Sequence, residues 1–174
     1  SSVALAVNQV TREKGKAFVN TGAGTADLTG KDCSPNTVHW LYDTWMLAHG
    51  TGSAVVKNGG DSWFFLTSDY AFGHALERDT SEVVKSSGGK VLGGVKVPLN
   101  TQDFSSFLLQ AQSSKAKIIG LANAGGDTIN SINMPDEVFP IMFMLFVTLS
   151  YCFSTKSRPE VMKLMMSRSS SRPR

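Results

Sequence analysis

The sequence lacks the residue patterns on which common enzyme and metal sites are built. It contains no GxSxG nucleophile elbow, no HExxH metal motif and no Walker GxxxxGK(S/T) loop. The partial dinucleotide fingerprint at Gly22 and Gly24 fails because Asp27 stands where the third glycine or alanine belongs. Cys33 and Cys152 form no CxxC or Cys/His metal spacing, although they could pair with each other in one disulfide. We therefore expect no catalytic residues, no metal and no cofactor.

Most of the chain also has no excess of basic over acidic side chains, or of acidic over basic ones. The 174 residues are 41% hydrophobic and 18% charged, as in ordinary globular proteins, and the net charge is +3. Residues 1–133 hold 11 basic and 11 acidic side chains, so the positive charge comes from the C-terminal segment. Nucleic acid binding depends on a basic surface. The neutral body therefore predicts no nucleic acid partner.

Helices and strands alternate along residues 1–132. The apolar run 63–67 predicts a strand that is buried on both faces, and the spacing of the apolar residues that follow predicts a helix over 71–85. Further strands are predicted at 16–21, 37–42, 90–97 and 117–121, and further helices at 2–14, at 43–56 and from Asp103 onward. Asp127 and Thr128 indicate the cap of one more helix. Units of roughly 25 to 40 residues are typical of right-handed βαβ crossovers, so the sequence predicts an α/β fold with parallel sheets flanked by helices.

Small and polar residues follow three of the predicted strands. They occupy positions 20–24, 68–70 and 123–127. In an open parallel sheet, small ligands bind beyond the carboxyl ends of the strands. If the chain forms two lobes that face each other, these three turns line one cleft. Glycine-rich turns are also common without any ligand, so the residues alone leave a purely structural role open.

Five segments carry, in their order and spacing, a resemblance to a known family. They are 20–30 (NTGAGTADLTG), 38–52 (VHWLYDTWMLAHGTG), 62–79 (SWFFLTSDYAFGHALERD), 89–107 and 118–132 (IIGLANAGGDTINSI). They resemble the periplasmic branched-chain amino-acid-binding proteins, the type I solute-binding proteins of ABC importers. Members often carry (F/I)-(I/L)-x-x-D-Y-x-(F/Y)-G in the third segment. The resemblance implies two lobes, with residues 1–42 as the remnant of an incomplete first lobe and residues 43–132 as the second.

The resemblance also implies a set of ligand-binding residues. Ser1 or Ser2 and a glycine-rich loop would face the ligand from the first lobe, and Tyr70 or Phe72 would form the aromatic wall of the second. Ala124 stands where some members present a tyrosine, which leaves room for larger or aromatic ligands. The full candidate set is Ser1, Ser2, Gly22, Ala23, Gly24, Thr25, Asp43, Tyr70, Phe72, Asn123 and Ala124.

Solute import is the function that the resemblance implies. The chain would be the substrate-binding component of an ABC importer, which closes on a branched-chain or other amino acid, or an aromatic or carboxylate compound, and delivers it to a permease. Such a protein acts in the periplasm, and because Ser1 opens the chain without a signal segment, we expect the natural sequence to begin further upstream. An incomplete first lobe should expose an apolar edge at Phe18 and Val19. The residues also fit an alternative, a cytoplasmic ligand-sensing or nucleotide-binding α/β domain.

From residue 133 onward the chain departs from the family pattern. The run 138–153 is apolar and contains Pro140, and a Ser/Arg-rich end follows it. This run is slightly short for a usual membrane span. We expect it to form a helix or an apolar segment that packs weakly on the body. A membrane anchor and a fused or frameshifted reading frame both stay open as the origin of residues 133–174.

Overall fold

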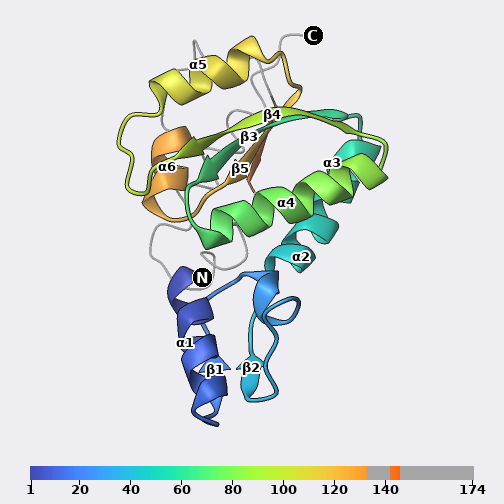
Figure 1. Ribbon diagram of the computed structural model, residues 1–174. Coiled ribbons are helices and arrows are strands. Elements are labelled where there is room, and N and C mark those ends of the chain that lie inside the picture. The colour runs from blue at the N-terminus through green and yellow to red at the C-terminus, as the bar shows by residue number, and fades with distance from the viewer. Residues whose placement is uncertain (133–141, 146–174) are drawn as a thin grey trace, which may run out of the picture.

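Two parallel sheets organise the chain in a computed structural model, which describes residues 1–132 and the backbone of residues 142–145 (Figure 1). The smaller sheet pairs β1 with β2, and the larger sheet has the strand order β4-β3-β5-β6. All strand pairs are parallel. The strands are β1 (Phe18–Asn20), β2 (Thr37–His39), β3 (Ser62–Ser68), β4 (Lys90–Val97), β5 (Ile118–Ala122) and β6 (Met142–Leu145). The predicted α/β class with parallel sheets is confirmed.

Strand β3 lies at the centre of the larger sheet, and six of its seven residues are buried. Because side chains alternate along a strand, Trp63 and Phe65 enter one core while Phe64 and Leu66 enter another. Helix α4 (Ala71–Ser86) covers the first face and helix α5 (Ser105–Ser113) covers the second, as Figure 1 shows. The prediction of a strand buried on both faces is therefore confirmed.

The single helix predicted over 43–56 consists of three consecutive pieces. These are α2 (Thr44–Leu47), a π-helical segment η2 (Ala48–Gly52) and α3 (Ser53–Lys57). A Cβ atom at Gly52 would lie 3.3 Å from Val83 Cγ1 of α4. The wider π turn thus contains Gly52, whose lack of a side chain lets the helical segment 44–57 approach α4 closely.

The smaller sheet is covered on only part of its surface. Helix α1 (Ser2–Glu13) runs beside β1, and a short 3-10 helix, η1 (Ala26–Leu28), follows that strand. Val19 and Val38, which are paired in register, remain 58% and 48% exposed. The predicted exposure is therefore confirmed for Val19 and wrong for Phe18, which is half-buried, while Val38 is exposed beside Val19.

Two expectations about the C-terminal part differ from the structure. Helix α6 (Gly126–Ile132) begins before Asp127 and Thr128, so these residues lie in its first turn instead of capping it. Residues 142–145 form strand β6 beside β5, whereas we expected a helix or a loosely packed segment. A short apolar run without alternation does not distinguish a strand from a helix, and the open edge of β5 offers backbone hydrogen bonds to a strand.

The remaining predictions about the tail lie outside the described residues, namely at 133–141 and 146–174. None of the helices formed by the described residues is long and apolar enough to cross a membrane. Cys33 is exposed, but Cys152 is beyond the described range, so their pairing stays an open prediction. The proposed boundary between residues 132 and 133 likewise stays a prediction.

Candidate ligand-binding site

The ends of three strands meet around Gly24. A Cβ atom at Gly24 would lie 3.0 Å from Tyr42 Cε2 and 3.1 Å from Phe72 Cε2. Gly24 follows β1, Tyr42 follows β2, and Phe72 lies in the first turn of α4 directly after β3. The expected approach of Gly24 and Phe72 is therefore confirmed. Only a residue without a side chain fits between these two rings at their present positions.

Tyr70 is the more accessible of the two predicted aromatic residues. Its ring lies 6.0 Å from that of Phe72, measured between centroids. Phe72 is only 5% exposed and belongs to the core beneath α4, whereas Tyr70, Tyr42 and Ala124 are half-buried and pack against that core. The accessible aromatic surface at this edge is therefore formed mainly by Tyr42 and Tyr70. Phe72 supports it from below.

Burial and two neighbours keep the Tyr70 phenol protonated. Partial burial raises its pKa first, and the charges of Tyr42 and Asp127 raise the pKa further. A phenol with a raised pKa is neutral at physiological pH and can donate a hydrogen bond. Tyr70 therefore combines an aromatic face with a polar donor at the same edge of the sheet.

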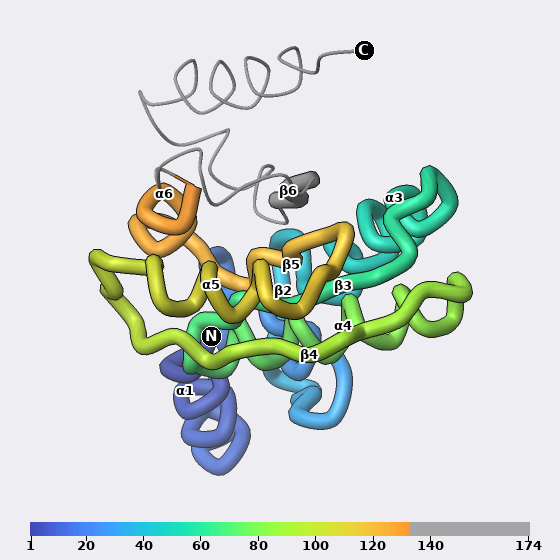
Figure 2. Tube along the Cα trace, turned by 90° about the horizontal axis from the view of Figure 1, so that it is seen from above, coloured from blue at the N-terminus to red at the C-terminus, as the bar shows by residue number. Residues whose placement is uncertain are grey.

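Ser1 and Ser2 lie beside the start of α4 (Figure 1), and the implied contact of one of them with a ligand stays a prediction. The backbone N–H of Ala71 donates to Ser2 Oγ at 3.4 Å. Figures 1 and 2 both show the N-terminus beside the first turn of α4. Ser1 Oγ is buried and has no hydrogen-bond partner among the described residues.

The glycine-rich loop is held largely by Asn20. Asn20 Oδ1 accepts from the backbone N–H groups of Gly22 at 3.3 Å and Ala23 at 2.9 Å, and its Nδ2 donates to Ala23 O at 2.6 Å. The hydroxyl of Thr25 is fully buried and accepts from Asp27 N at 3.3 Å, which caps η1. Two of the amides that we expected to be open to a ligand are therefore occupied. The Gly24 amide has no partner within residues 1–132.

The side chains of Asn123 and Asp127 form hydrogen bonds in the turn that follows β5. Asn123 is 1% exposed, and its Oδ1 accepts from Thr128 Oγ1 at 2.8 Å. Asp127 Oδ2 accepts from Ser68 Oγ at 3.2 Å, which ties the end of β3 to α6. These contacts give the Asn123 side chain a structural role, and they leave Ala124 as a half-buried side chain of this turn.

Asp43 makes its contacts elsewhere. Its side chain caps α2 by accepting from Met46 N at 2.8 Å. It lines an open surface depression of about 550 Å³, together with Asp27, Trp45 and Arg78. Among the contacts of the described residues, none joins the Asp43 carboxylate to the rings around Gly24.

Two residues of this cluster were not in the predicted set. Tyr42 ends the second predicted strand, so the strand-end rule that selected 68–70 and 123–127 would also have selected it. Asn20 could be seen as a turn residue, but its three hydrogen bonds depend on the shape of the turn. In residues 1–132, no group of three His, Cys, Asp or Glu side chains could hold a metal ion.

Parallel α/β units whose strand ends meet are the architecture of type I solute-binding proteins. Residues 1–138 match the family model described as periplasmic binding protein, and the chain therefore belongs to the periplasmic binding protein family. This is a family of solute-binding proteins and not of enzymes. Its members act in the periplasm, as the family name states.

Individual relatives agree with this assignment. The crystal structure of a periplasmic binding protein from Burkholderia mallei has a TM-score of 0.81 and 46% identity, covering 98% of this chain and 52% of its own. The amino acid ABC transporter substrate-binding protein from Pseudomonas fluorescens Pf-5 has a TM-score of 0.71 and 28% identity, covering 84% and 40%. A Leu/Ile/Val-binding protein homolog from Brucella abortus is 25% identical over 114 residues, which are 66% of this chain and 29% of the relative. The chain thus spans about half the length of the Burkholderia mallei protein and less than a third of the length of the Brucella abortus protein.

Proposed function

We propose that this chain contributes to the substrate-binding component of an ABC importer, which binds a small carboxylate-bearing solute and passes it to a membrane permease. The observation that carries the proposal is the meeting of Gly24, Tyr42 and Phe72 at the ends of three strands. A binding site for such a solute needs donors for the carboxylate and an apolar wall for the rest of the molecule. In keeping with the family, the natural protein would work in the periplasm.

The donors and the wall favour an aromatic or other large solute. The Gly24 amide lacks a partner among the described residues, and Tyr70 carries a protonated phenol nearby. These groups suit a carboxylate. Tyr42 and Tyr70 supply aromatic faces, and the small Ala124 leaves space beside the same core. Aromatic acids and large amino acids can contact such aromatic faces over a larger area than valine can.

Titration calorimetry tests this proposal directly. The panel consists of phenylalanine, leucine, isoleucine, valine, benzoate and 4-hydroxybenzoate, and ATP is added to test the alternative. Benzoate and 4-hydroxybenzoate are included because solved proteins of this fold from R. palustris hold them, at 18% and 20% identity to this chain. We expect at least one aromatic member to bind more tightly than valine. Binding of a nucleotide but of none of these acids would instead support the alternative of a nucleotide-binding domain.

Replacing Tyr42 by alanine should weaken binding of the preferred solute about tenfold, because one aromatic face of the proposed cleft is removed. Trp40→Ala is the matched control, since Trp40 lies two residues away and is 75% exposed. Calorimetry on both variants shows whether the loss of solute affinity is specific to position 42. An equal effect of the two substitutions, or no effect of Tyr42→Ala, would contradict the assignment of Tyr42 to the wall.

A further inference from the structure

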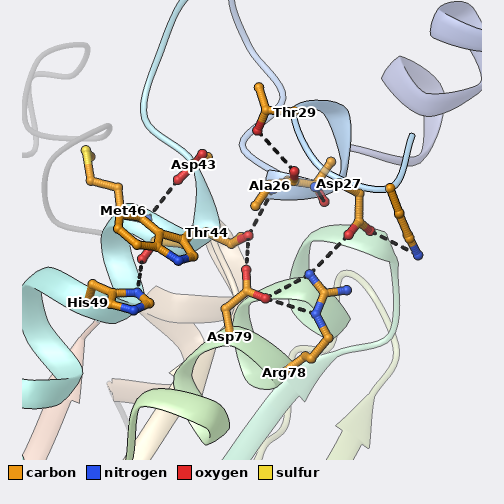
Figure 3. Close-up of polar contacts among 12 residues, drawn as sticks. Ala26, Asp27, Thr29, Asp43, Thr44, Met46, His49, Arg78 and Asp79 are labelled. Carbon is orange, nitrogen blue, oxygen red and sulfur yellow. Dashed lines mark hydrogen bonds and ion pairs between the residues drawn. The ribbon is translucent and has the colours of Figure 1, made fainter. Parts of the chain in front are cut away.

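A buried polar chain connects the glycine-rich loop to the middle of α4 (Figure 3). Thr44 Oγ1 donates to Asp79 Oδ2 at 2.6 Å and accepts from the backbone N–H of Ala26 at 3.0 Å. The backbone N–H of Thr44 donates to Gly24 O at 2.8 Å. Thr44 is fully buried and Asp79 is 7% exposed. Thr44 therefore links the backbone at Gly24 and Ala26 to the Asp79 carboxylate on α4.

Arg78 extends this chain to η1. Its Nη2 lies 2.8 Å from Asp79 Oδ1 and 3.1 Å from Asp27 Oδ1, and its Nε donates to Asp79 Oδ1 at 2.9 Å. Partial burial opposes the charged guanidinium, but the hydrogen bond to Asp79 and the charges of Asp79 and Asp27 raise the pKa of Arg78 overall. Lys31 lies 3.4 Å from the other oxygen of Asp27. The cations thus balance the two buried carboxylates.

The Asp79 carboxylate is buried on α4, and burying a charged group lowers the stability of the fold unless its contacts compensate. Asp79 lies on the inward stripe of α4 that also buries Leu76, Thr80 and Val83. An apolar residue at such a position is often as stable as a buried ion pair, because burial of charge is costly. The Asp79 carboxylate gains three bonds there, and one of them orients the Thr44 hydroxyl. This geometry indicates a function in fixing the loop.

We propose that Thr44, Asp79 and Arg78 are positioning residues for the loop from Gly22 to Thr25. Helix α4 carries Phe72 in its first turn and Asp79 two turns later, so the chain of bonds fixes the loop to the same helix that bears the aromatic turn. The distance between the Gly24 loop and Tyr70–Phe72 is thereby set before a ligand arrives. A preorganised site binds more tightly than one that must order its loop. The effect on ligand affinity rests on the proposed function, but the effect on the loop does not.

Hydrogen exchange on the whole chain tests the loop directly. Thr44→Val keeps the shape and the backbone N–H but removes the hydroxyl, and Thr44→Ser restores it. Ser53→Ala is the matched control, because Ser53 Oγ donates to His49 O on the same helical segment. We expect Thr44→Val to speed exchange of the Ala26 amide about tenfold, the effect of losing one ordinary hydrogen bond. Exchange in β3 should stay unchanged, and Thr44→Ser and Ser53→Ala should resemble the parent.

Two results would overturn the proposal. One is an unchanged Ala26 amide in Thr44→Val, and the other is faster exchange throughout β3, which would mean that Thr44 only stabilises the whole fold. If Thr44→Val does not fold, Asp79→Leu supplies the test, because it removes both the acceptor of the Thr44 hydroxyl and the charge that Arg78 contacts. Faster exchange at Ala26 then supports the chain of bonds, and parent-like exchange contradicts it.

Ligand affinity gives the second readout. For the solute that binds the parent most tightly, Thr44→Val should raise Kd about tenfold, while Thr44→Ser restores it. A parent-like Kd in Thr44→Val with a loosened loop would contradict the positioning role. If no solute binds the parent, the proposed function fails, but the exchange experiment still decides whether these residues fix the loop.

Discussion

Replacing Gly73 by alanine should destabilise the protein by about 3 kcal/mol or more, because there is no space for a side chain. A Cβ atom at Gly73 would lie 2.1 Å from Ser68 O and 2.9 Å from Ala122 O. Both oxygens belong to the backbone of the central strands β3 and β5, so they cannot rotate away as a side chain could. The first turn of α4 would have to lift off the ends of the sheet.

Chemical denaturation of Gly73→Ala and of Gly50→Ala measures this effect. Gly50 is the matched control, because it also lies in a helical segment but its Cβ would meet nothing within 4 Å. Gly50→Ala should leave the free energy of unfolding nearly unchanged or raise it slightly. A loss below about 1 kcal/mol in Gly73→Ala would mean that α4 does not approach the strand ends as closely as described.

Replacing Gly24 by valine should lower the affinity for the solute about a hundredfold or more. Even a single Cβ would meet the rings of Tyr42 and Phe72 at about 3 Å, and the two extra methyl groups of valine must displace them. Phe72 is buried, so Tyr42 or the whole loop would move. Either movement changes the proposed ligand surface while leaving the larger sheet intact.

Gly22→Ala tests whether the effect is specific to position 24. Gly22 lies in the same loop, and its Cβ would meet nothing within 4 Å. We expect calorimetry to give a parent-like Kd for Gly22→Ala. Wild-type affinity in Gly24→Val would show that the loop is not part of the site, and an equal loss in both variants would show that general loop distortion is responsible.

Features that depend on local pattern could be predicted from the sequence. The β3 strand follows from its apolar run, and the span 90–97 agrees with β4 residue for residue. The approach of Gly24 and Phe72 could be predicted because the carboxyl ends of parallel strands lie at one edge. In these cases the local signal and the architecture point to the same answer.

Features that depend on long-range partners could not be predicted. Nothing in the apolar stretch around 142–145 specifies β5 as its neighbour, and pairing decides that it is a strand. Asp79 follows the helical spacing of a buried stripe, but its bond to Thr44 joins residues 35 positions apart. Asn20 occupies two loop amides only because the turn brings them to its side-chain oxygen. Side-chain bonds of this kind require the folded geometry.

The most direct test of the proposed site is an NMR titration of the ¹⁵N-labelled chain with the tightest-binding acid of the panel. We predict that the amide shifts concentrate at Gly24, Tyr42, Tyr70 and Ala124, at the meeting strand ends. Residues around the depression lined by Asp43 and the exposed β4 strand should move little. Shifts that concentrate at that depression, with none at Gly24 or Tyr70, would contradict the account.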